Sequence, residues 1–218
     1  MNLPPIGSIA VEGPPKSGKR ILAELLARKS GGRLVEDVRE NPYLESFLRR
    51  PEDERAPILT QLVFLVQRGL TLLSLNQKSL LPGPVFTDFL LERDKLYALQ
   101  FLKDDEFYLY DSLYALMEKN TRRPDRVCFL QLSTPELLKR VELYGTPSEK
   151  RVSPSLWGAL NEAFQYFVFH YQGTPSLVVK ADNLDFRKGN LGVDEIWREL
   201  RNMDGRKQFF FLEEGRKE

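Results

Sequence analysis

GSIAVEGPPKSGKRILAELLARK, residues 7–29, places a short apolar run, a glycine-bracketed loop and an amphipathic helical pattern in direct succession. The loop Gly13–Lys19 fills G-x-x-x-x-G-K, the pattern of a phosphate-binding loop. Glycines let the backbone curl so that N–H groups point at phosphate oxygens, and the following helix adds its positive end. Glycine-rich turns also join strands to helices in many folds, but a Gly-Lys pair at the helix start favours the phosphate-binding interpretation.

The loop supplies the first group of candidate site residues. Lys19 is expected to reach the β- and γ-phosphates of a nucleoside triphosphate. The next residue in the pattern is Ser or Thr, whose hydroxyl binds Mg²⁺, but this chain has Arg20 there. The magnesium site is therefore expected to be weakened. The nucleotide-binding residues predicted from the loop are Gly13, Lys16, Ser17, Gly18, Lys19 and Arg20.

The composition predicts one globular domain. The chain has 218 residues, with 42% hydrophobic and 29% charged residues and a net charge of +1. This balance gives no reason to expect nucleic acid or an acidic membrane as a partner. We expect a domain over residues 1–200 and a tail over 201–218.

The scarce residue types exclude several kinds of site. Cys128 is the one cysteine, so there is no internal disulfide, and its apolar neighbours predict burial. His170 is the one histidine, which argues against a histidine metal site or a catalytic triad. No signal peptide is evident, and no apolar run is judged to approach the ~20 residues of a membrane span. A cytoplasmic protein is expected.

Apolar runs alternate with helical patterns along the chain. This alternation predicts an α/β protein with a parallel sheet covered on both faces. We also expect a central buried helix at residues 57–77 and a polar loop at residues 142–151. The tail is compatible with an edge strand, a docking segment or partial disorder. The predicted strands are 8–12, 33–37, 84–88, 126–132 and 176–180.

Two helix starts are visible in the second half. Ser133, followed by Thr-Pro-Glu, predicts a hydroxyl cap with Glu136 closing a capping box. Ser153, before Pro154, predicts another start. The second helix carries an aromatic stripe, which we interpret as core or dimer contact and not as a cofactor site.

Six segments occur in order over about residues 7–180: IAVEGPPKSGK (9–19), VEDVRENPYLESF (35–47), QLVFLVQR (61–68), VFTDFLLERDKLYAL (85–99), PDRVCFLQLSTPELLKRV (124–141) and FQYFVFHY (164–171). Together they resemble the deoxynucleoside kinases, particularly their bacterial branch. The resemblance implies a P-loop kinase fold with five parallel strands in the order 2-3-1-4-5, a mobile lid loop and a homodimer formed through helices. It also implies transfer of the γ-phosphoryl of ATP, with Mg²⁺, to the 5′-hydroxyl of a deoxynucleoside.

On the acceptor side, Glu36 matches the glutamate that follows the family's second strand and accepts the proton of the 5′-hydroxyl. Asp37 replaces a proline, so a neighbouring acid is also present; both could instead cap the next turn. Gln61 matches the glutamine that recognises the base, because an amide offers a donor and an acceptor side by side. It could also be satisfied internally. Arg68, two turns later, holds a carboxylate or lines the pocket.

On the phosphate side, Asp88 matches the acid at the end of the third strand and is the candidate for binding Mg²⁺ or orienting the 5′ end. Arg140 matches the first arginine of the lid and is a candidate catalytic residue with Glu36 and Lys19. Glu149 matches the lid glutamate that reaches the 3′-hydroxyl.

The lid departs from the family pattern, because Tyr144 and Thr146 stand where two arginines are expected. Two explanations remain open. In the first, the positive charge of the lid has been relocated to Arg20 or to Lys16, Lys150 or Arg151, and the enzyme is active. Alternatively, the protein is a nucleotide-binding pseudokinase that serves as a sensor or interaction module. A nucleoside monophosphate kinase fits the acceptor-side segments less well.

Overall fold

A single parallel sheet forms the centre of the computed structural model, which describes residues 6–50, 55–77, 83–189, 192–203 and 207–211. Its order is β2-β3-β1-β4-β5-β6. All five predicted strands are confirmed in the implied order, and a sixth, formed within the expected tail, pairs with β5 at the edge. The strands are β1 Ser8–Glu12, β2 Arg33–Val35, β3 Val85–Thr87, β4 Arg126–Gln131, β5 Ser176–Lys180 and β6 Lys207–Phe210.

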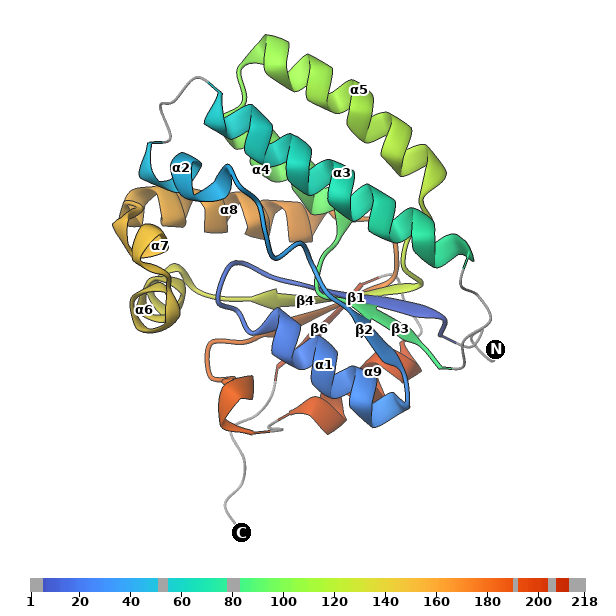
Figure 1. Ribbon diagram of the computed structural model, residues 1–218. Coiled ribbons are helices and arrows are strands. Elements are labelled where there is room, and N and C mark those ends of the chain that lie inside the picture. The colour runs from blue at the N-terminus through green and yellow to red at the C-terminus, as the bar shows by residue number, and fades with distance from the viewer. Residues whose placement is uncertain (1–5, 51–54, 78–82, 190–191, 204–206, 212–218) are drawn as a thin grey trace.

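Helices cover both faces of this sheet (Figure 1). One face carries α1 Lys19–Ser30 and α9 Val193–Asn202, and the other carries α3 Ala56–Gln77, α4 Asp94–Phe101, α5 Asp104–Asn120 and α8 Pro154–His170. At one end of the sheet lie α2 Leu44–Arg49, α6 Thr134–Tyr144 and α7 Pro147–Arg151, and single turns are η1 Leu91–Arg93 and η2 Phe186–Lys188.

The central strands are buried on both sides, as their continuous apolar sequences predict. Residues of β1, β4 and β5 pack against α1, α6 and α9 in one cluster and against α8 in a second. Cys128 of β4 is fully buried, as expected. The sheet therefore fixes the positions of the loops at its carboxyl edge, where parallel α/β folds bind ligands.

The predicted helix starts are confirmed, with one correction. The Ser133 hydroxyl accepts from Glu136 N, and the Ser153 hydroxyl accepts from Leu156 N. The capping box at Ser133 is not formed, because its N–H donates to Asp182 at 2.7 Å. That contact ties the start of α6 to the loop after β5.

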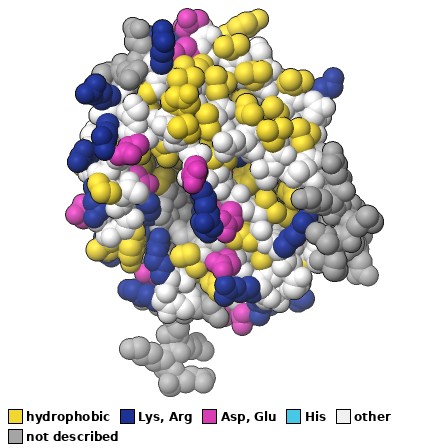
Figure 2. All heavy atoms as spheres, viewed as in Figure 1, with side chains coloured by type: hydrophobic (Ala, Val, Ile, Leu, Met, Phe, Trp, Pro, Cys, Tyr) yellow, Lys and Arg dark blue, Asp and Glu magenta, His cyan; other side chains and the backbone are white. Residues whose placement is uncertain are grey.

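The prediction of a central, buried helix at 57–77 is only partly right. Helix α3 lies on the outside of the molecule, with Val66 and Leu70 36% and 58% exposed. Figure 2 shows hydrophobic side chains gathered where α3 and α5 face the viewer. The judgement that no apolar run approaches a membrane span was wrong by length and composition, since Ala56–Leu75 has a mean hydropathy of 1.6. The same helix, however, buries polar Thr60, Gln61 and Arg68, which suits the wall of a site.

The expected polar loop at 142–151 is instead the end of α6 followed by the short helix α7. Thr146 and Glu149 form a capping box around its first turn: Thr146 Oγ1 accepts from Glu149 N at 3.2 Å, and Glu149 Oε2 accepts from Thr146 N at 2.6 Å. Pro147 occupies the first turn. The lid segment is therefore an ordered turn of helix that holds Glu149 at a fixed position.

Candidate active site

A cavity of about 310 Å³ opens at the carboxyl end of the sheet, lined by the phosphate-binding loop and by residues of α2, α3, α4, α7 and α8. Its wall combines aromatic and aliphatic side chains with a few charged groups, the usual make-up of a small-molecule site. The polar and charged residues that line it are Lys16, Lys19, Asp37, Thr60, Gln61, Arg68, Arg93, Asp94, Tyr97 and Glu149.

The phosphate-binding loop has the expected strand–loop–helix form. Gly18 caps α1 with φ +90°, a conformation that favours glycine. Lys19 Nζ lies 2.6 Å from Glu12 Oε1, and the fully buried Glu12 carboxylate also accepts the Gly13 and Leu90 N–H groups. Burial and the neighbouring Arg93 lower the pKa of Lys19, against the opposing charge of Glu12. The ion pair with Glu12 thus holds the Lys19 ammonium beside the phosphate-binding loop.

Arg20 does not block the loop. Its guanidinium turns outward to Glu36, 2.8 Å away, and the Arg39 Nε also donates to Glu36 at 2.6 Å. Glu36 is 35% exposed and does not line the cavity. The predicted catalytic base therefore lies outside the site. Successive side chains of an extended chain point in opposite directions, so Glu36 faces away from the cavity that Asp37 lines.

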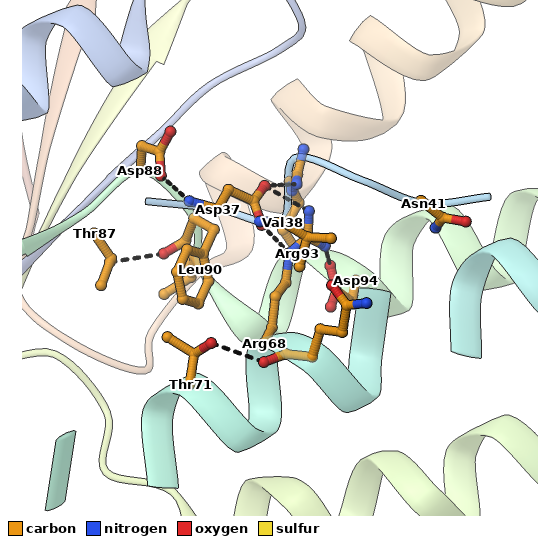
Figure 3. A network of polar contacts seen from close by, with 12 residues as sticks. Asp37, Val38, Asn41, Arg68, Thr71, Thr87, Asp88, Leu90, Arg93 and Asp94 are labelled. Atoms are coloured by element: carbon orange, nitrogen blue, oxygen red, sulfur yellow. Dashed lines mark hydrogen bonds and ion pairs between the residues drawn. The ribbon is translucent and has the colours of Figure 1, made fainter. Parts of the chain in front are cut away.

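Asp37 is the acid that faces the cavity. The Asp37 carboxylate accepts hydrogen bonds from Arg68 Nε at 2.6 Å and from a terminal Arg68 nitrogen at 2.7 Å (Figure 3). The Asp37 backbone N–H donates to Asp88 Oδ1 at 2.5 Å. Burial alone would raise the pKa of Asp37, but Arg68, with Lys19 and Arg93 behind it, lowers it to about 2. The group is ionised at neutral pH.

Arg68 also pairs with Asp94, so two carboxylates share one buried arginine (Figure 3). Arg93 forms an ion pair with Glu12 at 3.0 Å. Burial raises the pKa of Asp94 to about 6, although Arg68 and Arg93 oppose this effect. Arg68 is thus a carboxylate holder that also lines the pocket, as the sequence allowed.

Gln61 lies beside this network on α3. It is 5% exposed and lines the cavity together with Phe64, Tyr97 and Phe101. The aromatic rings and the amide on one wall suit a planar, hydrogen-bonding ligand such as a nucleobase. The geometry is compatible with the role that the resemblance gave to Gln61.

Asp88 is the one predicted metal ligand. It follows β3 and is 5% exposed, and burial raises its pKa. It does not itself line the cavity but lies directly behind Asp37, whose N–H it accepts. Among the described parts of the chain there is no cluster of three or more His, Cys, Asp or Glu side chains able to hold a metal by themselves. The residues fit a Mg²⁺ ion held by one carboxylate with phosphate oxygens and water, which is how Mg²⁺ is commonly bound beside a nucleotide.

Comparison with known proteins shows the family. The deoxynucleoside kinase family model matches residues 9–203. The chain belongs to the deoxynucleoside kinase family. It is 28% identical over 192 residues to the deoxyguanosine kinase of Bacillus subtilis (strain 168), covering 85% of this chain and 91% of that protein.

Solved structures share the fold. A deoxyadenosine kinase from M. mycoides with bound dATP superposes with a TM-score of 0.72 at 23% identity, covering 90% of this chain and 100% of that one. The same enzyme with bound dCTP gives a TM-score of 0.73 at 20% identity, with the same coverage. The P-loop kinase fold is confirmed, and the protein belongs to a family of phosphotransferases.

Within this kinase fold, Arg140 does not have the predicted catalytic position. It is 4% exposed, and its guanidinium donates to Glu136 and to four backbone carbonyls, none of which lies in the cavity wall. These acceptors engage the guanidinium donors, and Arg140 itself does not line the cavity. The four carbonyls are those of Ser17, Ala181, Asp182 and Leu184.

The two residues that replace lid arginines have contacts of their own. The Tyr144 hydroxyl donates to Asp185 at 3.3 Å, and the Arg187 guanidinium lies 4.1 Å from the centre of the Tyr144 ring. Thr146 caps α7, as described above. Neither side chain offers a positive charge, so the lid contributes none at these two positions.

The structure adds site residues that were not singled out from the sequence: Glu12, Arg93, Asp94 and Tyr97. The signal for three of them lay in the run Glu92-Arg93-Asp94-Lys95-Leu96-Tyr97, a cluster of charges immediately after a buried segment. The sequence does not show which side chains of this run, on η1 and α4, face the cavity. Glu12 looked like the end of an apolar strand, and only its position under Lys19 reveals its role.

Proposed function

We propose that the protein is a deoxynucleoside kinase that transfers the γ-phosphoryl of ATP to the 5′-hydroxyl of a deoxynucleoside. The observation that carries this proposal is the convergence of Lys19, Asp37 and Gln61 on one cavity. A phosphate-binding lysine, an ionised carboxylate and a base-recognising amide are the groups that such a transfer requires. The names of the similar proteins support a deoxynucleoside as the acceptor.

In this mechanism each group has a defined task. Gln61 and the aromatic wall orient the base, and Glu149 receives the 3′-hydroxyl. The loop amides and Lys19 hold the phosphates. As the 5′-oxygen bonds to the γ-phosphorus and ADP departs, the hydroxyl proton passes to Asp37. Because the pKa of Asp37 is about 2, that proton moves late, once the attacking oxygen has become acidic.

Mg²⁺ would be held by Asp88 with donor phosphate oxygens, and it would neutralise phosphate charge. Arg20 supplies no hydroxyl for it, so one protein ligand of the usual pattern is missing. We expect the magnesium requirement to persist through Asp88 but with weaker affinity.

The test measures formation of 5′-monophosphates from ATP, Mg²⁺ and each of the four deoxynucleosides. We expect a product with at least one of them. Asp37→Asn should lower kcat by about a hundredfold or more, whereas Glu36→Gln, matched in chemistry one residue away, should stay within about threefold. The reverse ranking would restore Glu36 as the base. Absence of product from folded protein with all four would refute the kinase proposal.

We also propose a homodimer formed through α4 and α8, in line with the resemblance. The two helices pack side by side and carry the exposed apolar side chains Leu99, Tyr166 and Phe169, which are 64%, 67% and 69% exposed. A wide groove runs between them. Light scattering should give twice the chain mass of 25.3 kDa, and Tyr166→Lys with Phe169→Lys should give the monomer.

A further inference from the structure

Lys16 has an unusual backbone conformation. Its φ is +62°, and in the parts of the chain that the structure describes it is the one non-glycine residue with positive φ. Side chains with a Cβ disfavour this region, and residues held there cluster at functional sites. The phosphate-binding loop therefore carries a lysine at a position where glycine would fit with less strain.

The Lys16 side chain reaches across the cavity mouth. Its Nζ lies 2.8 Å from Glu149 Oε2, and the two side chains are 21% and 18% exposed. Both residues line the cavity. Glu149 is itself held by the capping box of α7, so the ion pair connects the phosphate-binding loop to the lid.

The other cations near the phosphates are already engaged. Arg140 is buried against backbone carbonyls, and Arg20 faces Glu36 outside the cavity. Arg68 is shared by Asp37 and Asp94. Lys16 differs in its place: it lines the cavity, and its carboxylate partner, Glu149, lies on a short helix at the cavity mouth.

Resting on the function proposed above, we propose that Lys16 neutralises the transferring phosphoryl group in place of the missing lid arginines, moving from Glu149 to the γ-phosphate when both substrates are bound. The acceptor's 5′-oxygen bonds to the γ-phosphorus, the bond to the bridging oxygen breaks, and ADP leaves with that electron pair. The hydroxyl proton goes to Asp37, and Lys16 keeps its own proton throughout.

Glu149 makes this exchange possible. When the acceptor's 3′-hydroxyl donates to the Glu149 carboxylate, that carboxylate gains a partner besides the Thr146 N–H and Lys16, and it holds Lys16 less strongly. Lys16 then becomes available at the moment when the phosphate charge must be stabilised. Acceptor binding should accordingly strengthen binding of the γ-phosphate, and the coupling should be reciprocal.

The experiment compares wild type, Lys16→Met, Lys16→Gly and Lys16→Arg. Calorimetry with the Mg²⁺ complexes of AMP-PNP and ADP, each titrated in the presence of the deoxynucleoside, isolates the γ-phosphate, because only AMP-PNP carries one and neither complex transfers it. We expect Lys16→Met and Lys16→Gly to bind AMP-PNP at least about fivefold more weakly and ADP within twofold of wild type, and kcat to fall by about a hundredfold. Lys16→Arg should retain most of the activity. Lys139→Met, an exposed lysine on α6 outside the cavity wall, is the matched control and should match wild type.

The two charge-removing variants separate charge from backbone strain. If Lys16→Gly keeps wild-type kcat while Lys16→Met loses it, the effect lies in the backbone and the proposal is wrong. If neither variant changes the ratio of AMP-PNP to ADP affinity, the proposal is also wrong, even where the wild type shows no turnover. Lys150→Met is measured in parallel: if it loses the AMP-PNP preference while Lys16→Met keeps it, the charge comes from the lid and the proposal is wrong. An inactive wild type whose AMP-PNP preference depends on Lys16 would refute the kinase proposal and keep this one as a γ-phosphate contact.

Discussion

Arg140 offers the sharpest test of the structure, because the family pattern and the observed contacts give it different roles. Arg140→Met removes every guanidinium donor while keeping most of the aliphatic volume. Ala181 O keeps the Leu184 N–H at 3.1 Å, but the other carbonyls lose their Arg140 donor. A buried carbonyl without a donor costs about 1–3 kcal/mol. We therefore expect the free energy of unfolding to fall by on the order of 4 kcal/mol, allowing for local relaxation and water.

Urea unfolding at pH 7 measures this change, and kinase assays at low temperature measure turnover of the fraction that stays folded. We expect large destabilisation with kcat per folded molecule within about tenfold of wild type. Arg140→Lys should be nearly as unstable, because one ammonium cannot reproduce a planar fork that reaches several carbonyls. A variant with wild-type stability and a kcat about a thousandfold lower, the scale of an arginine finger, would refute this reasoning and restore the catalytic role.

Three further predictions concern separate parts of the molecule. Because the pKa of Asp37 falls from 3.8 to about 2 on folding, its carboxylate stabilises the fold above pH 4, and this contribution disappears as the pH falls toward 2. The difference in free energy of unfolding between wild type and Asp37→Asn, followed by urea titration, should therefore shrink by about 2 kcal/mol from pH 6 to pH 2.5; a constant difference would contradict this. Gln61→Leu should raise KM for the deoxynucleoside by at least about tenfold, since it removes a paired donor and acceptor, and leave AMP-PNP binding unchanged. Burial raises the pKa of the Cys128 thiol to about 12, so a thiol reagent should label it no faster than the protein unfolds; faster labelling would show that β4 is accessible.

Much of the fold could be predicted because its signals are local. Each strand is a short run of apolar residues between turn signals, and alternation with helices leaves a parallel sheet as the natural arrangement. The phosphate-binding loop follows from its glycines and lysine alone. The edge strand β6 was harder, because Lys207–Phe210 mixes charge with apolar residues and gains its place only by pairing with β5.

The site was less predictable because its contacts are long-range. Glu36 and Asp37 are adjacent acids, and only the direction of the chain after β2 decides which one faces the cavity. Arg140 has its acceptors in segments about 40 residues later and about 120 residues earlier, and nothing near it in the sequence indicates them. The pairing of Asp94 with Arg68 joins two different helices. In each case the direction or the partner of a side chain is set by the tertiary fold, which a local sequence pattern does not show.

The departures at positions 20, 144 and 146 are not independent losses in the folded molecule. Arg20 removes a metal-binding hydroxyl but holds Glu36 on the outside, which leaves Asp37 as the acid inside the cavity. Tyr144 removes a lid charge and joins α6 to the loop after β5. With Thr146, a second lid charge is lost, but its hydroxyl caps α7, the helix that presents Glu149 to Lys16. Each replacement thus stabilises a fixed arrangement around the cavity, and the phosphate-facing charge falls to the loop lysines. Lys16 and Lys19 both line the cavity, which is the arrangement that relocated charge requires.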